Sequence, residues 1–310
     1  MIWSRFWKVK ISEHYDGNSP DVFYVTHAQY ICVGSKSNFV EAYATDADWV
    51  AILGGAGNDT IICGASRHLD INAGVGNDLI SLANMNWATV NGGDGNDTVD
   101  FSRNSEGVSA DLTGGPAYKI GDPYVWSILK NVENLTGSGG SDRLTGSSAA
   151  NLLSGDLGND SLYGGGGNDT LKGGAGDDII NGGTGNDVIR LDGGGNDTFI
   201  FDSHFGQDSI TRVNPADANG QDVVQFNGIN VADILFQRQG DDLRITVAAS
   251  TDTLTLLNWY AHPGAGTDSP NFDVDQFQAG EVVLSADTVE QMVTIVGAAP
   301  VSMAELSVHI

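Results

Sequence analysis

The chain of 310 residues is long enough for one repeat domain with flanking parts, or for two or three modules. Its 40 acidic residues against 14 basic residues give a formal net charge of −26. So acidic a chain repels nucleic acid, and we expect no nucleic-acid partner. No apolar run approaches the ~20 residues that a membrane-spanning helix needs, so we expect no membrane span.

Residues 1–33 are aromatic and irregular, and we interpret them as an N-terminal cap. Alternating apolar and polar residues around Trp3–Ile11 and Val22–Val25 predict short strands, which would cover the open end of a following stack. The opening residues MIWSRFWKVKIS include no long apolar run, so we predict no cleavable N-terminal signal. The two cysteines, Cys32 and Cys63, are expected to be free, buried thiols.

A nonapeptide with the pattern Gly-Gly-x-Gly-x-Asp-x-U-x, where U is a large apolar residue, occurs ten times between residues 54 and 200. The glycine half favours a tight turn, because glycine adopts positive φ without penalty, and the x-U-x half predicts a short strand with one buried face. Such a strand cannot bury that face alone, so the copies must stack, with two nonapeptides in each coil of about 18–19 residues. The sequence therefore predicts an all-β fold, a parallel β-roll solenoid. Its core positions would be Ile61, Ile80, Val99, Leu144, Leu153, Leu162, Leu171, Ile180, Ile189 and Phe199.

The first block of the roll, residues 34–102, places Asp59, Asp78 and Asp97 at a constant interval that is slightly longer than two nonapeptides. Apolar strand residues recur at the same interval, but no glycine-rich turn lies midway between these aspartates. We therefore expect both strands of each coil in this block and a single column of acidic turns.

Residues 103–134 interrupt the repeats. Turn signals at Gly114-Gly115-Pro116 and Asp122-Pro123 predict an inserted β-hairpin or loop that projects from the roll. Insertions in solenoids often lie on a binding face, and a plain excursion of the chain is the alternative.

The second block, residues 135–202, predicts two columns of acidic turns, one at each edge of the roll. In one column Asp142, Asp160 and Asp178 are separated by exact multiples of the nonapeptide, and Asp197 follows after a slightly longer interval. The other column consists of Asn151, Asp169 and Asp187, again two nonapeptides apart.

After residue 202 the nonapeptide period ends and aromatic strands begin. Residues 203–290 are expected to form a small β-rich module with strands at Asp222–Phe226, Ile234–Arg238, Leu243–Val247 and Thr253–Trp259. Residues 291–310 are interpreted as a C-terminal tail and a candidate secretion signal.

The aspartate columns point to a metal. Strands stack ~4.8 Å apart, so carboxylates of neighbouring coils would be close and would repel one another. A hard divalent cation between the coils removes this repulsion, and Ca²⁺ fits best because it accepts carboxylate and backbone carbonyl oxygens. Zinc prefers His or Cys, which the glycine-rich turns lack.

The chain from about Gly34 to Leu284 resembles the haemolysin-type (RTX) calcium-binding proteins, and the repeats carry this resemblance. The stretches HFGQDSI, DVVQFNGI and DTLTLLNWY resemble the module that follows such repeats. The resemblance implies a parallel β-roll with several Ca²⁺ ions in the turns. It also implies a secreted, extracellular bacterial protein that leaves the cell through type I secretion machinery by an uncleaved C-terminal signal. The ligand aspartates it implies are Asp59, Asp78, Asp97, Asp142, Asp160, Asp169, Asp178, Asp187 and Asp197. The accompanying turn glycines are Gly55, Gly57, Gly74, Gly76, Gly93, Gly95, Gly165, Gly167, Gly174, Gly176, Gly183 and Gly185. Asn151 departs from the pattern.

No sequence motif of a catalytic site occurs: the chain lacks HExxH, GxSxG, GxGxxG and GxxxxGK[ST]. The first hypothesis is therefore a non-enzymatic module that folds on binding Ca²⁺ outside the cell. One alternative is a secreted carbohydrate-active or hydrolytic enzyme, or its accessory C-terminal part. Another is a protein of calcium-dependent adhesion or surface assembly, whose glycan or surface partner is unknown.

Overall fold

The computed structural model describes residues 8–10, 21–26, 30–32, 38–43, 50–64, 68–83, 87–212, 220–260, 274–296 and 299–307. Side chains are described from residue 50 onward, apart from residues 123–126, 292 and 294–296 in the strands and helices. The chain divides into two compact units, Met1–Gly146 and Ser147–Ile310.

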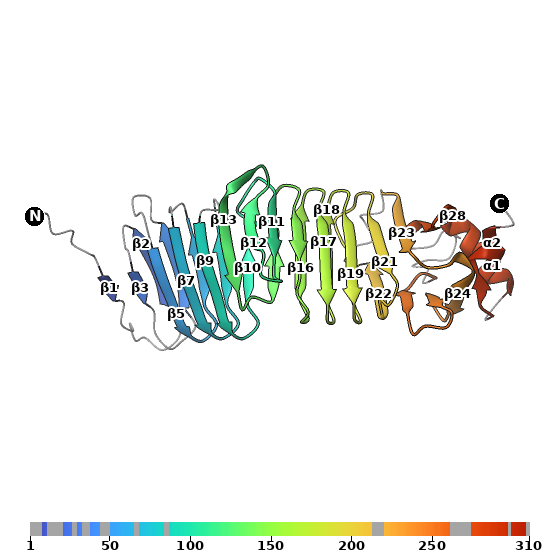
Figure 1. Ribbon diagram of the computed structural model, residues 1–310, viewed down its shortest axis with the longest axis horizontal. Helices are drawn as coiled ribbons and strands as arrows, with labels where there is room; N and C mark the ends of the chain where they lie inside the picture. Colours follow the sequence, from blue (N-terminus) through green and yellow to red (C-terminus); the bar gives the residue numbers. More distant parts are fainter. Residues whose placement is uncertain are drawn as a thin grey trace, which may run out of the picture. The chain divides into compact units, whose positions relative to one another are not determined.

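In the first unit, successive strands alternate between two parallel sheets, so that two strands make one coil (Figure 1). The order is β1-β3-β5-β7-β9 in one sheet and β2-β4-β6-β8-β10-β14 in the other. The register places Ile61 beside Ile80 and Ile80 beside Val99, which is the constant interval seen in the sequence of this block. The strands are β1 (Lys8–Lys10), β2 (Asp21–Thr26), β3 (Tyr30–Cys32), β4 (Asn38–Tyr43), β5 (Val50–Ala56), β6 (Thr60–Cys63), β7 (His68–Val75), β8 (Leu79–Leu82), β9 (Trp87–Asp94), β10 (Thr98–Asp100) and β14 (Asn134–Thr136).

The inserted segment lies within the sheet instead of projecting from it. β11 (Val108–Asp111), β12 (Pro116–Lys119) and β13 (Asp122–Lys130) are joined by antiparallel pairing, and β13 continues the sheet in parallel from β9. On its other side, β11 pairs in parallel with β15 (Arg143–Thr145). The expected hairpin is thus present as β12 and β13. The projection was wrong, because the hairpin's backbone groups are paired on both sides and extend the sheet.

The second unit begins with the same alternation. One sheet runs β17-β19-β21-β23-β27-β28, and the other runs β16-β18-β20-β22-β26-β25-β24-β29 (Figure 1). Its coil strands are β16 (Leu152–Leu157), β17 (Ser161–Gly166), β18 (Thr170–Ala175), β19 (Ile179–Thr184), β20 (Val188–Leu191), β21 (Thr198–Asp202), β22 (Gln207–Arg212) and β23 (Asp222–Asn227). β22 pairs in parallel with β20, and β23 with β21. The parallel roll therefore continues beyond residue 202, where the nonapeptide period ends.

The C-terminal module continues both of these sheets. β26 (Thr253–Leu256) pairs in parallel with β22, and β27 (Val274–Ala279) pairs in parallel with β23. Antiparallel strands then close the unit, namely β24 (Ile234–Gln239), β25 (Asp242–Val247), β28 (Val282–Ser285) and β29 (Val301–Ser302). The helices α1 (Ala286–Val296) and α2 (Met303–Ser307) pack beside β24 and β28 (Figure 1).

The segment expected to be a tail is partly folded into this module. β29 pairs with β24, and α2 buries Met303 and Leu306. Residues 308–310 lie outside the described residues. No helix within the described ranges is long and apolar enough to cross a membrane.

The core follows the sequence pattern. Each of the ten apolar residues predicted at position eight is at most 1% exposed. The all-β parallel roll is thereby confirmed, since one apolar residue per nonapeptide fills the space between the sheets.

Candidate metal centre

The turn glycines are required for two reasons. All twelve glycines predicted to accompany the aspartates have positive φ. In addition, a Cβ on Gly183 would clash with the carbonyl oxygen of Gly165, the equivalent residue of the preceding coil. A Cβ on Gly74 would likewise clash with the carbonyl oxygen of Gly55. The turns can therefore stack at strand spacing only where the residue of the later coil carries no side chain.

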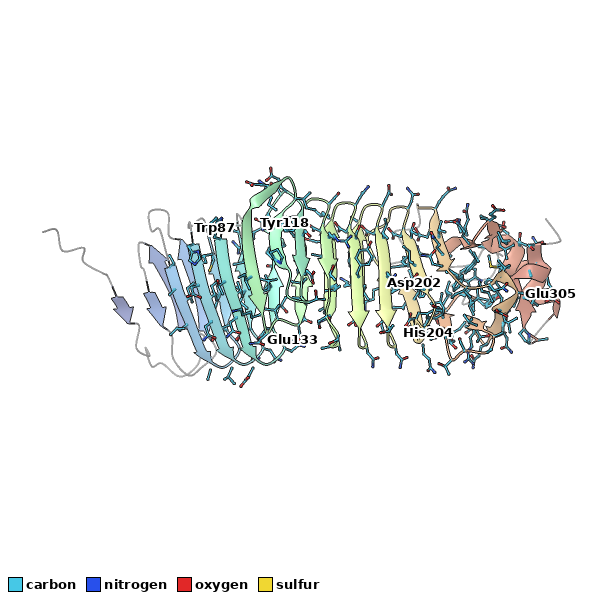
Figure 2. The ribbon with its side chains drawn as sticks, in the orientation of Figure 1. Trp87, Tyr118, Glu133, Asp202, His204 and Glu305 are labelled. Carbon is cyan, nitrogen blue, oxygen red and sulfur yellow. The ribbon has the colours of Figure 1, made fainter. Side chains whose placement is uncertain are left out.

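The predicted aspartates form ladders at the turns. In the first unit Asp78 Oδ1 accepts the backbone N–H of Asp59 at 2.7 Å, and Asp97 Oδ1 accepts that of Asp78 at 2.8 Å. The ladder ends at Glu133, whose Oε2 accepts the N–H of Asp97 at 2.8 Å; Figure 2 labels Glu133. These three aspartates are at most 2% exposed. Each carboxylate thus ties its own coil to the coil before it.

The second unit has two such ladders. In one, the N–H groups of Asn151, Asp169 and Asp187 donate in turn to Asp169, Asp187 and Asp208 at 2.7–2.8 Å. In the other, the N–H groups of Asp160, Asp178, Asp197 and Asp222 donate to Asp178, Asp197, Asp222 and Asp275 at 2.8–2.9 Å. The first ladder follows turns from the β17 sheet to the β18 sheet, and the second follows the return turns. Two edges of this unit therefore carry carboxylates.

The second carboxylate oxygen of several column aspartates lacks a hydrogen-bond donor. In these aspartates Oδ2 is buried and accepts no hydrogen bond within the described part of the chain. A buried anionic oxygen without a hydrogen bond is strongly destabilising, and a cation bound there supplies the missing partner. The residues with this arrangement are Asp78, Asp97, Asp169, Asp178, Asp187 and Asp208.

Burial also changes the acidity of these groups. It raises the pKa of Asp178 and of Asp208 to about 8, although the hydrogen bond that each carboxylate accepts from a backbone N–H lowers its pKa. Neighbouring carboxylates add to the rise in both cases. Burial likewise raises the pKa of Asp169 to about 7 and that of Asp97 to about 6. Without a cation the folded turns therefore favour protonated side chains.

The asparagine that precedes most of the repeat aspartates forms a second ladder, which was not predicted from the sequence. Asn58 Oδ1 accepts the N–H of Asn77, and Asn77 Oδ1 accepts that of Asn96. In the second unit Asn168 accepts from Asn186 in the same manner. The recurring Asn-Asp pair is the sequence signal. Asparagine reaches to the following coil, and aspartate reaches to the preceding one.

Two of the predicted turns are closed by serine. Asp142 Oδ2 accepts the N–H of Ser138, and its Oδ1 accepts the Ser138 hydroxyl and the N–H of Val108 at 2.6–2.7 Å. Asn151 Oδ1 accepts the N–H and the hydroxyl of Ser147. Both serines occupy the second glycine position of their repeat. In these turns serine donates to the side-chain oxygens, whereas the Oδ2 atoms of Asp178 and Asp187 accept no hydrogen bond from the described residues.

Asp208 and Asp222 also continue the two columns, although they were not predicted from the sequence, and each is 3% exposed. They follow Asp187 and Asp197 at 21 and 25 residues, so the regular spacing of the repeats did not find them. The available signal was the short sequence Gly-Gln-Asp, which occurs at both places.

The donor set fits Ca²⁺. The turns offer buried carboxylate oxygens between stacked backbone carbonyls, which are the hard oxygen ligands of this ion. Among the described residues no group of three or more His, Cys, Asp or Glu side chains is placed to hold a metal. A site here would therefore take most of its oxygens from the backbone. Cys63 is free and buried, and burial raises its thiol pKa to about 12, so it is a core residue; the side chain of Cys32 lies outside the described residues.

A comparison with known protein families agrees with the repeats described above. The sequence profile of the RTX calcium-binding nonapeptide repeat (4 copies) matches residues 51–65, 89–103, 136–171, 154–189 and 163–199. The chain thus contains RTX repeats, which imply calcium binding. The comparison with curated proteins gave no match.

Among solved structures, the extracellular lipase LipA from Serratia marcescens is similar to 76% of this chain, with 21% sequence identity and a TM-score of 0.31. The match covers 40% of the lipase chain.

Proposed function

We propose that this protein is a secreted, non-enzymatic RTX module in which several Ca²⁺ ions bound between coils drive the folding of the roll. The observation that carries the proposal is the set of buried Oδ2 atoms without a hydrogen bond, exemplified by Asp178 and Asp187. These atoms lie at regular steps along the columns, so each added coil creates another site.

The energetics support coupled binding and folding. Extracellular calcium modules bind Ca²⁺ with Kd values of roughly 10⁻⁴–10⁻³ M. At about ten times Kd each site stabilises the folded state by ~1.4 kcal/mol, so six sites would contribute about 8 kcal/mol, comparable with the ~5–15 kcal/mol of a whole domain. Without Ca²⁺, carboxylate repulsion and the conformational entropy of 42 glycines oppose folding.

This balance suits export through type I secretion machinery. At low Ca²⁺ inside the cell the chain would stay unfolded enough to pass through a channel, and millimolar Ca²⁺ outside would fold it. The C-terminal residues would provide the signal for export, as the resemblance to haemolysin-type proteins implies.

Isothermal titration calorimetry of the full chain tests the binding part of this proposal. We expect several Ca²⁺ ions to bind in the micromolar to millimolar range and Mg²⁺ to bind far more weakly, since Mg²⁺ demands a small octahedral site. Binding of fewer than two Ca²⁺ ions per chain, or equal binding of both metals, would contradict it.

A further inference from the structure

The outer face of one sheet in the first unit carries a row of side chains with rings. Trp87, the first residue of β9, is 49% exposed and pairs across the strands with His68 of β7. Tyr118 of β12 is half-buried, and Figure 2 labels it together with Trp87. The next residue of β9, Ala88, and the preceding residue of β12, Ala117, are at most 4% exposed. Trp87 and Tyr118 therefore point away from the core, because alternate residues of a strand lie on opposite faces.

The register of the strands places both rings at one level of the sheet. Thr89 of β9 pairs with Ile128 of β13, and Ile128 pairs with Pro116 of β12. Trp87 and Tyr118 each lie two residues from that line, and on the same side of it, because β13 runs parallel to β9 and antiparallel to β12. One strand, β13, separates their strands, so the two backbones are about 10 Å apart.

Polar side chains line the same face beside this row. The next line across β7 and β9 contains Asp70 and Thr89, and the line beyond it contains Asn72 and Asn91. Asn91 Nδ2 donates to Asn72 Oδ1 at 3.2 Å, and Asn91 Oδ1 accepts a hydrogen bond from Asn131 Nδ2 at 2.7 Å. Asp70 and Asn72 are exposed. The face thus combines flat rings with carboxylate, hydroxyl and amide groups, which include both donors and acceptors.

This face is close to neutral in a strongly acidic chain. The chain has a formal net charge of −26, but the charged side chains described in these lines are one acid, Asp70, and one base, Lys130. A polyanion would meet no basic patch here, and a polycation would meet no acidic cluster. The face therefore suits an uncharged ligand that has both a flat apolar side and many hydroxyl groups.

We infer that this face binds a neutral polysaccharide, an extended chain of β-1,4-linked pyranose rings that lies across β9, β13 and β12. The C–H groups on one side of a pyranose ring pack against the negative face of an aromatic ring, and the hydroxyl groups at its rim remain free for polar partners. In such a chain every second sugar has the same orientation, at close to the separation of the strands that carry Trp87 and Tyr118. Asp70 and Thr89 would then bind hydroxyl groups. The inference goes beyond the proposed function, in which Ca²⁺ only folds the surface.

The test is native affinity electrophoresis of the full chain in saturating Ca²⁺, in gels that contain hydroxyethylcellulose, xylan or galactomannan. At least one of these neutral β-1,4-linked polymers should retard the wild type, whereas dextran, a neutral polymer with α-1,6 links, should not. Trp87→Ala and Tyr118→Ala should each weaken binding by about tenfold, and Trp87→Phe and Tyr118→Phe should keep most of it. Tyr163→Ala is the matched control, because Tyr163 lies on the outer face of β17 in the second unit and pairs with Asn181.

The outcomes separate the inference from other uses of this face. A wild type that none of the three polymers retards, or that dextran retards equally, would overturn it, as would equal binding by Trp87→Ala and Tyr163→Ala. Sedimentation velocity without polysaccharide tests self-association: a mass that rises with concentration in the wild type but not in Trp87→Ala would assign the face to a second copy instead. Far-UV circular dichroism in Ca²⁺ checks that each variant folds, and Tyr118→Ala carries the comparison if Trp87→Ala does not.

Discussion

The carboxylate of Asp178 connects two coils, because its Oδ1 accepts the backbone N–H of Asp160 at 2.8 Å while its buried Oδ2 accepts no hydrogen bond. One oxygen thus fixes the register of the stack, and the other is left for a cation. On the proposed function, this side chain would stabilise the roll with Ca²⁺ bound and would carry an electrostatic penalty without it.

Replacement of Asp178 should have opposite effects with and without Ca²⁺. Asp178→Asn keeps an oxygen for the N–H of Asp160 but loses the charge, so in millimolar Ca²⁺ we expect a loss of about 1–3 kcal/mol of stability. In EDTA the same change removes a buried charge, and stability should stay equal or rise. Urea unfolding of the full chain under both conditions measures the two effects.

Asp142→Asn is the matched control for that experiment. Both oxygens of Asp142 accept hydrogen bonds, and Asn151 shows that an amide fits the equivalent serine-closed turn. The amide NH2 of Asp142→Asn would face one of the N–H groups that the carboxylate now accepts, so we expect a loss of about 1–3 kcal/mol that is the same in Ca²⁺ and in EDTA. If Asp142→Asn changed the dependence of stability on Ca²⁺ as much as Asp178→Asn does, the distinction between metal turns and serine-closed turns would be wrong.

The stacking of glycines can be separated from their backbone conformation. Gly183 has a φ of 95° and lies over the carbonyl oxygen of Gly165, whereas Gly121 has a φ of 92° and open space around it. Gly121→Ala should cost about 1–2 kcal/mol through backbone strain alone. Gly183→Ala should cost clearly more, because the added Cβ forces two coils apart. Thermal unfolding in saturating Ca²⁺ compares the two variants, and similar losses would contradict the account of the stacked turns.

The metal-free protein should become more ordered as the pH falls. Burial raises the pKa of Asp178 and of Asp208 to about 8, so the folded state holds protons that the unfolded state releases above a pH of about 4. The stability from these groups is greatest below pH 4 and is lost as the pH rises from about 4 to 8. Far-UV circular dichroism in EDTA should show more β signal at pH 5 than at pH 8.

Protons and Ca²⁺ should also compete. Between pH 8 and pH 6 the apparent calcium affinity should fall, because binding must displace protons from the column carboxylates. Asp178→Asn combined with Asp208→Asn should weaken both pH dependences. A metal-free signal that is flat over this range, or that grows with pH, would show that the buried carboxylates do not limit folding.

Much of the fold could be predicted from the sequence, because one nonapeptide pattern is repeated. Position eight had to be apolar and buried, as Ile61 and Phe199 are, and a strand of that length had to stack. The path of the inserted segment could not be predicted, because nothing local to residues 103–134 reveals that β13 and β11 pair with strands of the roll.

The candidate site was predictable only where the spacing stayed regular. Asp169 and Asp187 follow the period of two nonapeptides, but Asp208 and Asp222 come after longer turns and are recognised only by their neighbours in space. Conversely, Asp142 fits the period, yet Ser138 supplies its hydrogen bonds. Spacing identifies which residues share an edge, whereas the chemistry of each turn depends on which donors reach the carboxylate.

The central claim, that Ca²⁺ folds the roll, is tested most directly by far-UV circular dichroism of the full chain during a Ca²⁺ titration at constant ionic strength. We predict a cooperative gain of β signal near millimolar Ca²⁺, reversed by EDTA and not reproduced by Mg²⁺. A chain that shows its full β signal in EDTA at pH 8 would contradict the claim, because the buried carboxylates would then be accommodated without the cation.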